Sequence, residues 1–425
     1  MDKNVSVGKF KGDGVIWAVF IFLAIISIVE VFSAASSLSF KSGDYIRPIL
    51  KHCLLLGVGM MAMVATMNVK CKYFKLVAPV ALVLSFLGLL LVLFIGDFVN
   101  GSRRALVIFG IEFQPLELAK GAIILATAQI LSAMQTPKGA DKRAFAYIMT
   151  VCAAIVPLIM VENLSTALLI CTVVFLMMFI GKVPKRQLGR LFGCVMIVAA
   201  LFLTTVMAFG HDKSELEGQA KPNVEVRQEE PKEESLTDKV FHRFDTWKSR
   251  VLKFFHNEYI PPEEVDLDKD AQTAHSNIAI ASSNLVGRGP GNSVERDFLS
   301  QAFSDFIYAI IIEEMGIWGA GLVCLLYIIL LFRTATIANR CANSYPALLI
   351  MGFALLLVVQ AMFNMAVAVG LVPVTGQPLP LISKGGTSTI VNCIYIGIIL
   401  SVSYSAKKKD EVDKPSASST TDDDL

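Results

Sequence analysis

The stretch VIWAVFIFLAIISIVEVF, residues 15–32, consists almost entirely of apolar side chains. As an α-helix, a run of this length crosses the roughly 30 Å hydrocarbon core of a bilayer. Similar apolar runs recur along the chain, and 54% of the 425 residues are hydrophobic. The sequence therefore predicts a polytopic membrane protein.

The apolar runs predict an all-α fold with about ten membrane-spanning helices, because they are too long for barrel strands. The predicted spans are residues 14–33, 48–67, 76–96, 118–136, 145–161, 164–181, 190–209, 306–332, 345–370 and 388–405. Lysine and arginine gather on alternate connections and at both termini, which places those segments in the cytoplasm. Residues 1–13 and 406–425 are thus predicted to be cytoplasmic tails, the second of them disordered.

A long loop, residues 210–305, emerges on the extracytoplasmic side between predicted helices 7 and 8. Residues 212–238 are charged and lack aromatic side chains, which predicts a flexible insertion. Residues 240–255 place apolar side chains at helical spacing between basic ones, which predicts an amphipathic helix. Such a helix lies either on the outer membrane surface or against the spans of the protein itself.

Composition excludes several classes of function. A formal net charge of +2 gives no reason to expect nucleic-acid binding. The eight cysteines show no metal-ligand spacing, so no metal site is predicted, although a divalent cation such as Mg²⁺ or Mn²⁺ stays open as a cofactor. No nucleotide-binding motif is present. Chemistry on the outer face would need an activated substrate, such as a lipid-linked diphosphate sugar.

Ionisable residues at predicted membrane depth are the first candidates for function. Asp305 stands at the entrance of the eighth span, where it is either a general base or a helix N-cap. Glu117 and Lys120 share a helix face, as a functional pair or a structural ion pair. Glu313 and Glu314 lie within the eighth span, and at least one of them is expected to point into the bundle.

Outer-face cations and a glycine-rich segment form a second set of candidates. Arginine suits bidentate phosphate recognition, and this face carries Arg103, Arg104, Arg250, Arg288 and Arg296. The segment SKGGTS, residues 383–388, opens the last span. Its backbone N–H groups either bind a phosphate or form an ordinary helix cap.

Three groups of motifs, taken together, resemble the SEDS family of bacterial cell-wall proteins (FtsW, RodA and SpoVE). They are GSRR at 101–104 with FQPLELAK at 113–120; the Gly-x-Gly-x-Gly-x-Ser run at 287–293 with SDFIYA at 304–309 and EEMG at 313–316; and Asn364 with PVTGQPLP at 373–380 and SKGGTS at 383–388. The resemblance covers nearly the whole chain except the insertion and the tails.

The resemblance implies a peptidoglycan glycosyltransferase that polymerises lipid II into glycan strands at the outer leaflet, with Asp305 as the general base of an inverting transfer. The expected partners are lipid II, the nascent strand, a class B penicillin-binding transpeptidase and divisome membrane proteins. Gly291-Asn292-Ser293 looks closer to the FtsW branch, which implies the division septum of the bacterial cytoplasmic (inner) membrane. The expected substrate-binding residues are Arg103, Arg104, Glu117, Lys120, Arg250, Gly289, Gly291, Ser293, Arg296, Ser383, Lys384, Gly385 and Gly386.

The chain departs from the family pattern at a few positions: Asn163, Ser300, Gln301, Phe303 and Lys384. Two other functions are compatible with the residues. A lipid II flippase would use the intramembrane charges as a path for the polar headgroup. A non-catalytic divisome scaffold would need only the lipid-facing helix surfaces.

Overall fold

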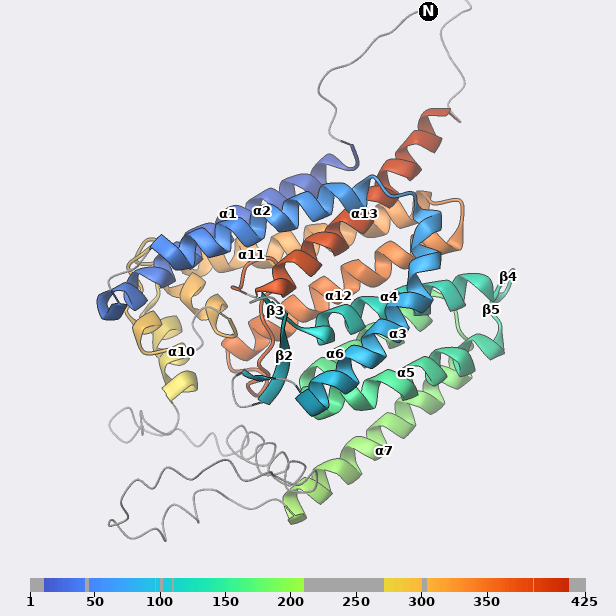
Figure 1. Ribbon diagram of the computed structural model, residues 1–425, viewed down its shortest axis with the longest axis horizontal. Helices are drawn as coiled ribbons and strands as arrows, with labels where there is room; N and C mark the ends of the chain where they lie inside the picture. The colour runs from blue at the N-terminus through green and yellow to red at the C-terminus, as the bar shows by residue number, and fades with distance from the viewer. Residues whose placement is uncertain are drawn as a thin grey trace, which may run out of the picture.

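The computed structural model describes residues 11–42, 46–95, 97–99, 102–108, 111–209, 271–299, 304–384 and 386–412. Within these residues ten long helices form one bundle (Figure 1), and each overlaps one predicted span. They are α1 (Gly14–Ser42), α2 (Ile46–Met67), α3 (Cys71–Ile95), α4 (Pro115–Ala133), α5 (Lys142–Glu162), α6 (Leu164–Ile180), α7 (Lys185–Phe209), α11 (Ile307–Arg340), α12 (Ser344–Ala368) and α13 (Thr387–Val412). The predicted insertion at 212–238, the amphipathic helix at 240–255 and the end of the tail lie outside the described residues.

The prediction of a multi-pass, helical membrane protein is confirmed. Among the described residues, eight helices are long and apolar enough to cross a bilayer. The helix α6 is apolar but has 17 residues, and α7 is not among the eight. The total of ten spans and their orientation therefore stay predictions.

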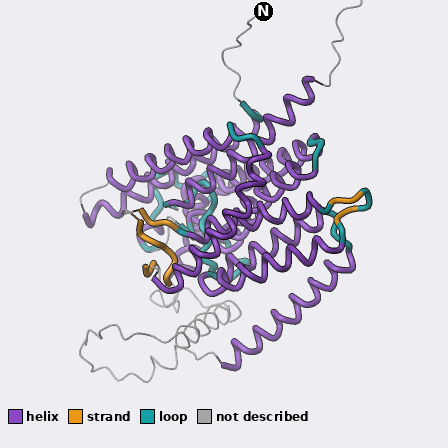
Figure 2. Tube along the Cα trace, turned by 45° about the vertical axis from the view of Figure 1, so that its right-hand side comes forward, coloured by secondary structure: helices purple, strands orange, loops and turns teal. Residues whose placement is uncertain are grey.

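Short strands interrupt the predicted all-α pattern in the connection between α3 and α4. Strands β1 (Asp97–Val99), β2 (Ser102–Ile108) and β3 (Ile111–Phe113) form an antiparallel sheet. A second hairpin, β4 (Gln135–Thr136) with β5 (Gly139–Ala140), follows α4. The two sheets lie at opposite ends of the bundle (Figure 2).

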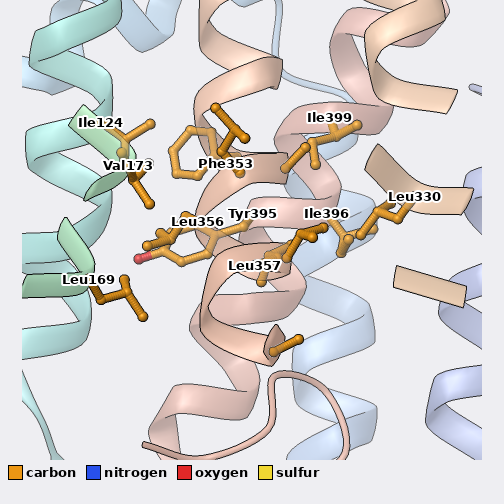
Figure 3. Close-up of a cluster of buried hydrophobic side chains, with 14 of the residues drawn as sticks. Ile124, Leu169, Val173, Leu330, Phe353, Leu356, Leu357, Tyr395, Ile396 and Ile399 are labelled. Atoms are coloured by element: carbon orange, nitrogen blue, oxygen red, sulfur yellow. The ribbon is translucent and has the colours of Figure 1, made fainter. Parts of the chain in front are cut away.

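The centre of the bundle is an apolar core shared by α4, α6, α11, α12 and α13. Figure 3 shows Phe353 and Leu357 of α12 facing residues of α13 and α4. The rings of Phe353 and Tyr395 stack with their centroids 4.8 Å apart. This packing fixes α12 and α13, and it thereby fixes the loop between them.

The described end of the long loop folds back onto the bundle. It contains α10 (Ala271–Ser282) and the 3₁₀ turn η1 (Glu295–Asp297). The Ser276 hydroxyl donates to the carbonyl of Ala368 at the end of α12, over 2.9 Å. His275 Nδ1 lies 2.6 Å from Glu295 Oε2, which joins α10 to η1.

The helix α11 breaks at Gly316, whose φ of 69° and ψ of −172° are not helical. The break allows the loop at 284–289 to pair with α11 through backbone hydrogen bonds. Arg288 N donates to Glu313 O over 2.9 Å, and Gly289 N donates to Glu314 O over 2.8 Å. A Cβ on Gly316 would lie 2.5 Å from the nitrogen of Gly287, so no side chain fits at this crossing.

We expect Gly316→Ala to destabilise the protein strongly. The positive φ alone costs roughly 1–3 kcal/mol for a residue with a side chain, and the overlap with Gly287 adds to this cost. Gly321→Ala is the matched control, because a Cβ there meets nothing within 4 Å. Thermal unfolding of the purified variants in detergent measures both. Equal melting temperatures for the two variants would contradict the crossing.

Candidate active site

The loop between α12 and α13, residues 369–386, is irregular in backbone yet largely buried. Irregular backbone at membrane depth is tolerated only where protein or water satisfies its polar groups. Side chains of three helices donate hydrogen bonds to backbone carbonyls of the loop. Ser27 donates to Ile382 over 2.8 Å, and the Tyr327 hydroxyl donates to Pro380. Gln360 donates to Pro378 over 2.9 Å, and Asn364 donates to Gln377 over 2.7 Å. These bonds tie α1, α11 and α12 to one loop.

Asp305 stands beside this loop, in the turn that precedes α11. Its carbonyl accepts from Asn364 Nδ2 over 2.9 Å, and its Oδ1 accepts from the Ser304 hydroxyl over 2.9 Å. The Ser383 hydroxyl donates to the Ser304 carbonyl over 2.7 Å. The N-cap of α11 is Phe306, so capping does not account for Asp305. The turn is thus fixed from two sides while the Asp305 side chain is only half-buried.

The SKGGTS segment contributes a cation next to this turn. Ser383 is buried, and its hydroxyl also accepts from Leu379 N over 2.7 Å. Lys384 follows directly. Burial lowers the pKa of Lys384, and the positive charge of the neighbouring Lys51 lowers it further. Two ammonium groups therefore stand near one another at the end of the bundle that carries Asp305.

Glu117 and Lys120 form the structural ion pair that their spacing allowed. Lys120 Nζ lies 2.8 Å from Glu117 Oε1 and donates to Gln360 Oε1 over 2.9 Å. The Glu117 side chain is 5% exposed and the Lys120 side chain is 1% exposed. Since Gln360 in turn donates to the carbonyl of Pro378, the pair links α4 through α12 to the buried loop.

Glu313 and Glu314 both point inward, with no exposed surface. They accept hydrogen bonds from the loop that crosses α11. Gly291 N donates to Glu314 over 2.9 Å, the Ser293 hydroxyl donates to Glu313 over 2.5 Å, and Val294 N donates to Glu313 over 3.1 Å. The two carboxylates therefore organise the Gly-x-Gly-x-Gly-x-Ser run.

Two arginines balance the charge of these glutamates. Arg288 Nη1 lies 3.1 Å from Glu313, and Arg296 Nη1 lies 3.8 Å from Glu314. Arg296 also donates to the carbonyls of Ser33 and Gly291. Gly289, Gly291, Ser293 and Arg296 thus have structural contacts, and their predicted contact with substrate stays a prediction.

The structure gives less information on the other predicted site residues. Arg250, Gly385, Ser300, Gln301 and Phe303 lie outside the described residues. Arg103 and Arg104 lie on β2, with Arg103 opposite Phe98 of β1. The backbone of Gly386 has a φ of 55°. Asn163 caps α6, because its side chain accepts from Ser165 N over 3.0 Å and from Thr166 N over 3.2 Å.

The sequence analysis missed Gln360 and Gln377 as residues that build the site. Gln377 Nε2 donates to the Thr166 hydroxyl over 2.5 Å and ties the loop to α6. A polar side chain inside an apolar span was the available signal for Gln360, one helical turn before Asn364. Within the described ranges no three His, Cys, Asp or Glu side chains form a ligand cluster, so these residues offer no protein-only site for Mg²⁺ or Mn²⁺.

Comparison with known proteins identifies the family. The sequence profile of the FtsW/RodA/SpoVE family, described as "Cell cycle protein", matches residues 13–219 and 236–408. The chain belongs to this family. These are the SEDS proteins that the motifs resembled, so the prediction of the family is confirmed.

Individual SEDS proteins resemble the chain over most of its length. A protein of Coxiella burnetii named "Probable peptidoglycan glycosyltransferase FtsW" is 27% identical over 91% of this chain and 95% of its own. A protein of Geobacter metallireducens with the same name is 28% identical over 93% of this chain and 95% of its own length. Such names are numerous among the relatives of this SEDS chain.

Solved SEDS structures share the fold. One chain, from a study of "structural coordination of polymerization and crosslinking by a peptidoglycan synthase complex", superimposes with a TM-score of 0.66 at 25% identity, covering 93% of this chain and 98% of that one. Thermus thermophilus RodA superimposes with a TM-score of 0.59 at 22% identity, covering 92% and 96%. The second likeness supports the fold alone.

We expect Lys120→Met to destabilise the protein by about 3–5 kcal/mol, because it leaves the buried Glu117 carboxylate without its cation. The double variant Glu117→Gln with Lys120→Met removes both charges and should recover most of this loss. Thermal unfolding in detergent of the wild type, both single variants and the double variant gives the coupling energy. A double variant no more stable than Lys120→Met would contradict the ion pair.

Proposed function

We propose that this protein is a peptidoglycan glycosyltransferase that polymerises lipid II at the outer leaflet of the bacterial cytoplasmic membrane. The observation that carries the proposal is the turn of Asp305 at one end of the bundle, which Asn364 and Ser383, the residue before Lys384, hold in place. The names of the SEDS relatives support the same activity. The family description "Cell cycle protein" supports service at the division septum, where divisome membrane proteins would be partners. The solved relative from a complex of polymerization and crosslinking supports a class B penicillin-binding transpeptidase as a further partner.

In the proposed reaction Asp305 acts as general base. Its carboxylate accepts the proton of the acceptor sugar hydroxyl while the hydroxyl oxygen bonds to the anomeric carbon of the donor. The bond from that carbon to the diphosphate oxygen breaks, and undecaprenyl diphosphate leaves with the electron pair. Attack opposite the leaving group inverts the anomeric centre. A positioned general base contributes roughly 10²–10⁴-fold to the rate.

The diphosphate leaving group gains negative charge as the bond breaks, so nearby cations stabilise the transition state. The Ser383 hydroxyl bonds the turn of Asp305, and this bond supports the next residue, Lys384, in that role. Lys51 adds a second positive charge close to Lys384. The start of α13, as a helix N-terminus, suits the same anion.

The buried charges that motivated a flippase have other roles in the structure. Glu117 pairs with Lys120, and Glu313 and Glu314 bind the crossing loop. A headgroup path through them would require these contacts to break. The half-buried Asp305 carboxylate, by contrast, favours an enzyme over a scaffold.

We expect Asp305→Asn to lower lipid II polymerisation by at least about 10²-fold without loss of folded protein. Asparagine keeps the acceptor for the Ser304 hydroxyl but cannot take a proton. The assay uses the purified chain with its cognate transpeptidase and lipid II, and glycan strands are resolved on a gel.

Asp297→Asn is the matched control, because Asp297 lies eight positions earlier and its side chain is half exposed at 51%. It should polymerise like the wild type. Equal polymer from Asp305→Asn and wild type would remove Asp305 as the base. Lipid II transport without polymer from the wild type would favour the flippase.

Lys384→Gln should lower kcat/KM for lipid II by roughly 10–100-fold, the loss expected for a hydrogen bond to a charged group. Lys384→Arg keeps the charge and should retain more activity than Lys384→Gln. Steady-state polymerisation rates over a range of lipid II concentrations measure both. Equal rates for Lys384→Gln and wild type would exclude contact between Lys384 and the diphosphate.

A further inference from the structure

A cavity opens at the opposite end of the bundle from Asp305. It has a volume of about 520 Å³ and lies between the start of α3, the end of α4 and the start of α12. The helix α12 has 25 residues, a length of about 37 Å at 1.5 Å per residue. Because Asn364, near the far end of α12, bonds Asp305, this cavity is separate from the candidate active site.

The charged side chains that line the cavity are both cationic. They are Lys72 and Lys75, which project from the first turns of α3. Lys75 Nζ lies 4.8 Å from the ring centroid of Tyr345. Residues 343–346, at the start of α12, also line the cavity, and the N-cap Asn343 makes no side-chain capping bond. These groups together form an environment for an anion.

The hydroxyl of Tyr345 is the observation that points to a ligand. Tyr345 lines the cavity, and its side chain is 2% exposed. The hydroxyl oxygen has no hydrogen-bond partner among the residues that the structure describes. A buried hydroxyl is normally paired with protein, water or a ligand. A phosphate oxygen in the cavity would supply this partner.

An apolar groove lies further along α3. It has a volume of about 360 Å³ and is lined by Pro79 and Leu82 of α3, Ile130 of α4 and Tyr147 of α5. Pro79 and Leu82 lie four and seven positions after Lys75, so all three share one helix face. The charged cavity and the apolar groove therefore lie one after the other along the same face of α3.

We propose that the cavity and the groove together bind one anionic phospholipid. The phosphate lies between Lys72, Lys75 and the Tyr345 hydroxyl, and an acyl chain follows the groove beside Leu82. Leu76, next along α3, is 73% exposed, as expected of a surface that faces lipid. A free phosphate ion would leave the groove without a role, which favours a lipid as the source of the anion. The positive-inside pattern assigns the site to the cytoplasmic leaflet.

The test is native mass spectrometry of the full chain in detergent, titrated with dioleoyl phosphatidylglycerol. The double variant Lys72→Gln with Lys75→Gln should bind this lipid roughly 30-fold more weakly, the factor expected for two cations near a membrane surface. The control double variant, Lys138→Gln with Lys185→Gln, removes two exposed lysines outside the cavity and should bind like the wild type. Equal weakening in both double variants, or none in either, would overturn the site.

Tyr345→Phe tests the hydroxyl separately. It should weaken binding of phosphatidylglycerol while the melting temperature without lipid is kept, and Tyr404→Phe, on the exposed Tyr404 of α13, should change neither. Unchanged affinity in Tyr345→Phe would overturn the role of the hydroxyl. Equal binding of dioleoyl phosphatidylcholine would overturn the selection for an anionic lipid. Displacement of the lipid by an equal concentration of inorganic phosphate would identify a free anion as the ligand instead.

Discussion

The structure depends on one constraint: the loop between α12 and α13 is irregular but lies inside a bundle of apolar helices. Carbonyl groups that are buried in this way need hydrogen-bond partners, and protein side chains supply them. Ser27, Gln360 and Asn364 are among the donors, and they come from helices distant in the sequence. Their bonds hold the loop, and the loop holds the turn of Asp305 through Ser383.

Side chains also compensate for the break in α11, but here they accept hydrogen bonds instead of donating them. Glu313 and Glu314 are acceptors, and they bind the N–H and hydroxyl groups of the loop that crosses at Gly316. Bonds to ionised carboxylates are stronger than bonds between neutral groups, so two buried charges can order a whole loop. Asp305 lies between the crossing loop and the two glutamates in the sequence, and its turn is also bonded to Asn364 and Ser383, so its backbone is fixed although it belongs to no helix.

Hydropathy predicted each long helix, because the length of an apolar run directly reflects the thickness of the bilayer. The same reasoning could not predict strands β1–β3 or the break at Gly316, since both depend on contacts with distant segments. Within the site, the spacing of Glu117 and Lys120 was enough to predict a pair. The bond from Ser293 to Glu313, twenty positions later, had no local signal. A backbone acceptor such as the Pro378 carbonyl gives no sequence signal either, because every residue carries a backbone carbonyl.

The contacts also narrow the choice of cations for a phosphate near Asp305. Arginine is the better bidentate ligand for phosphate, but Arg288 and Arg296 face Glu313 and Glu314, which already balance their charge. Burial lowers the pKa of Lys384 and the charge of Lys51 lowers it further, and a bound anion would stabilise the charged form of Lys384. The proposed contact with a diphosphate is therefore assigned to Lys384 and Lys51 rather than to these two arginines.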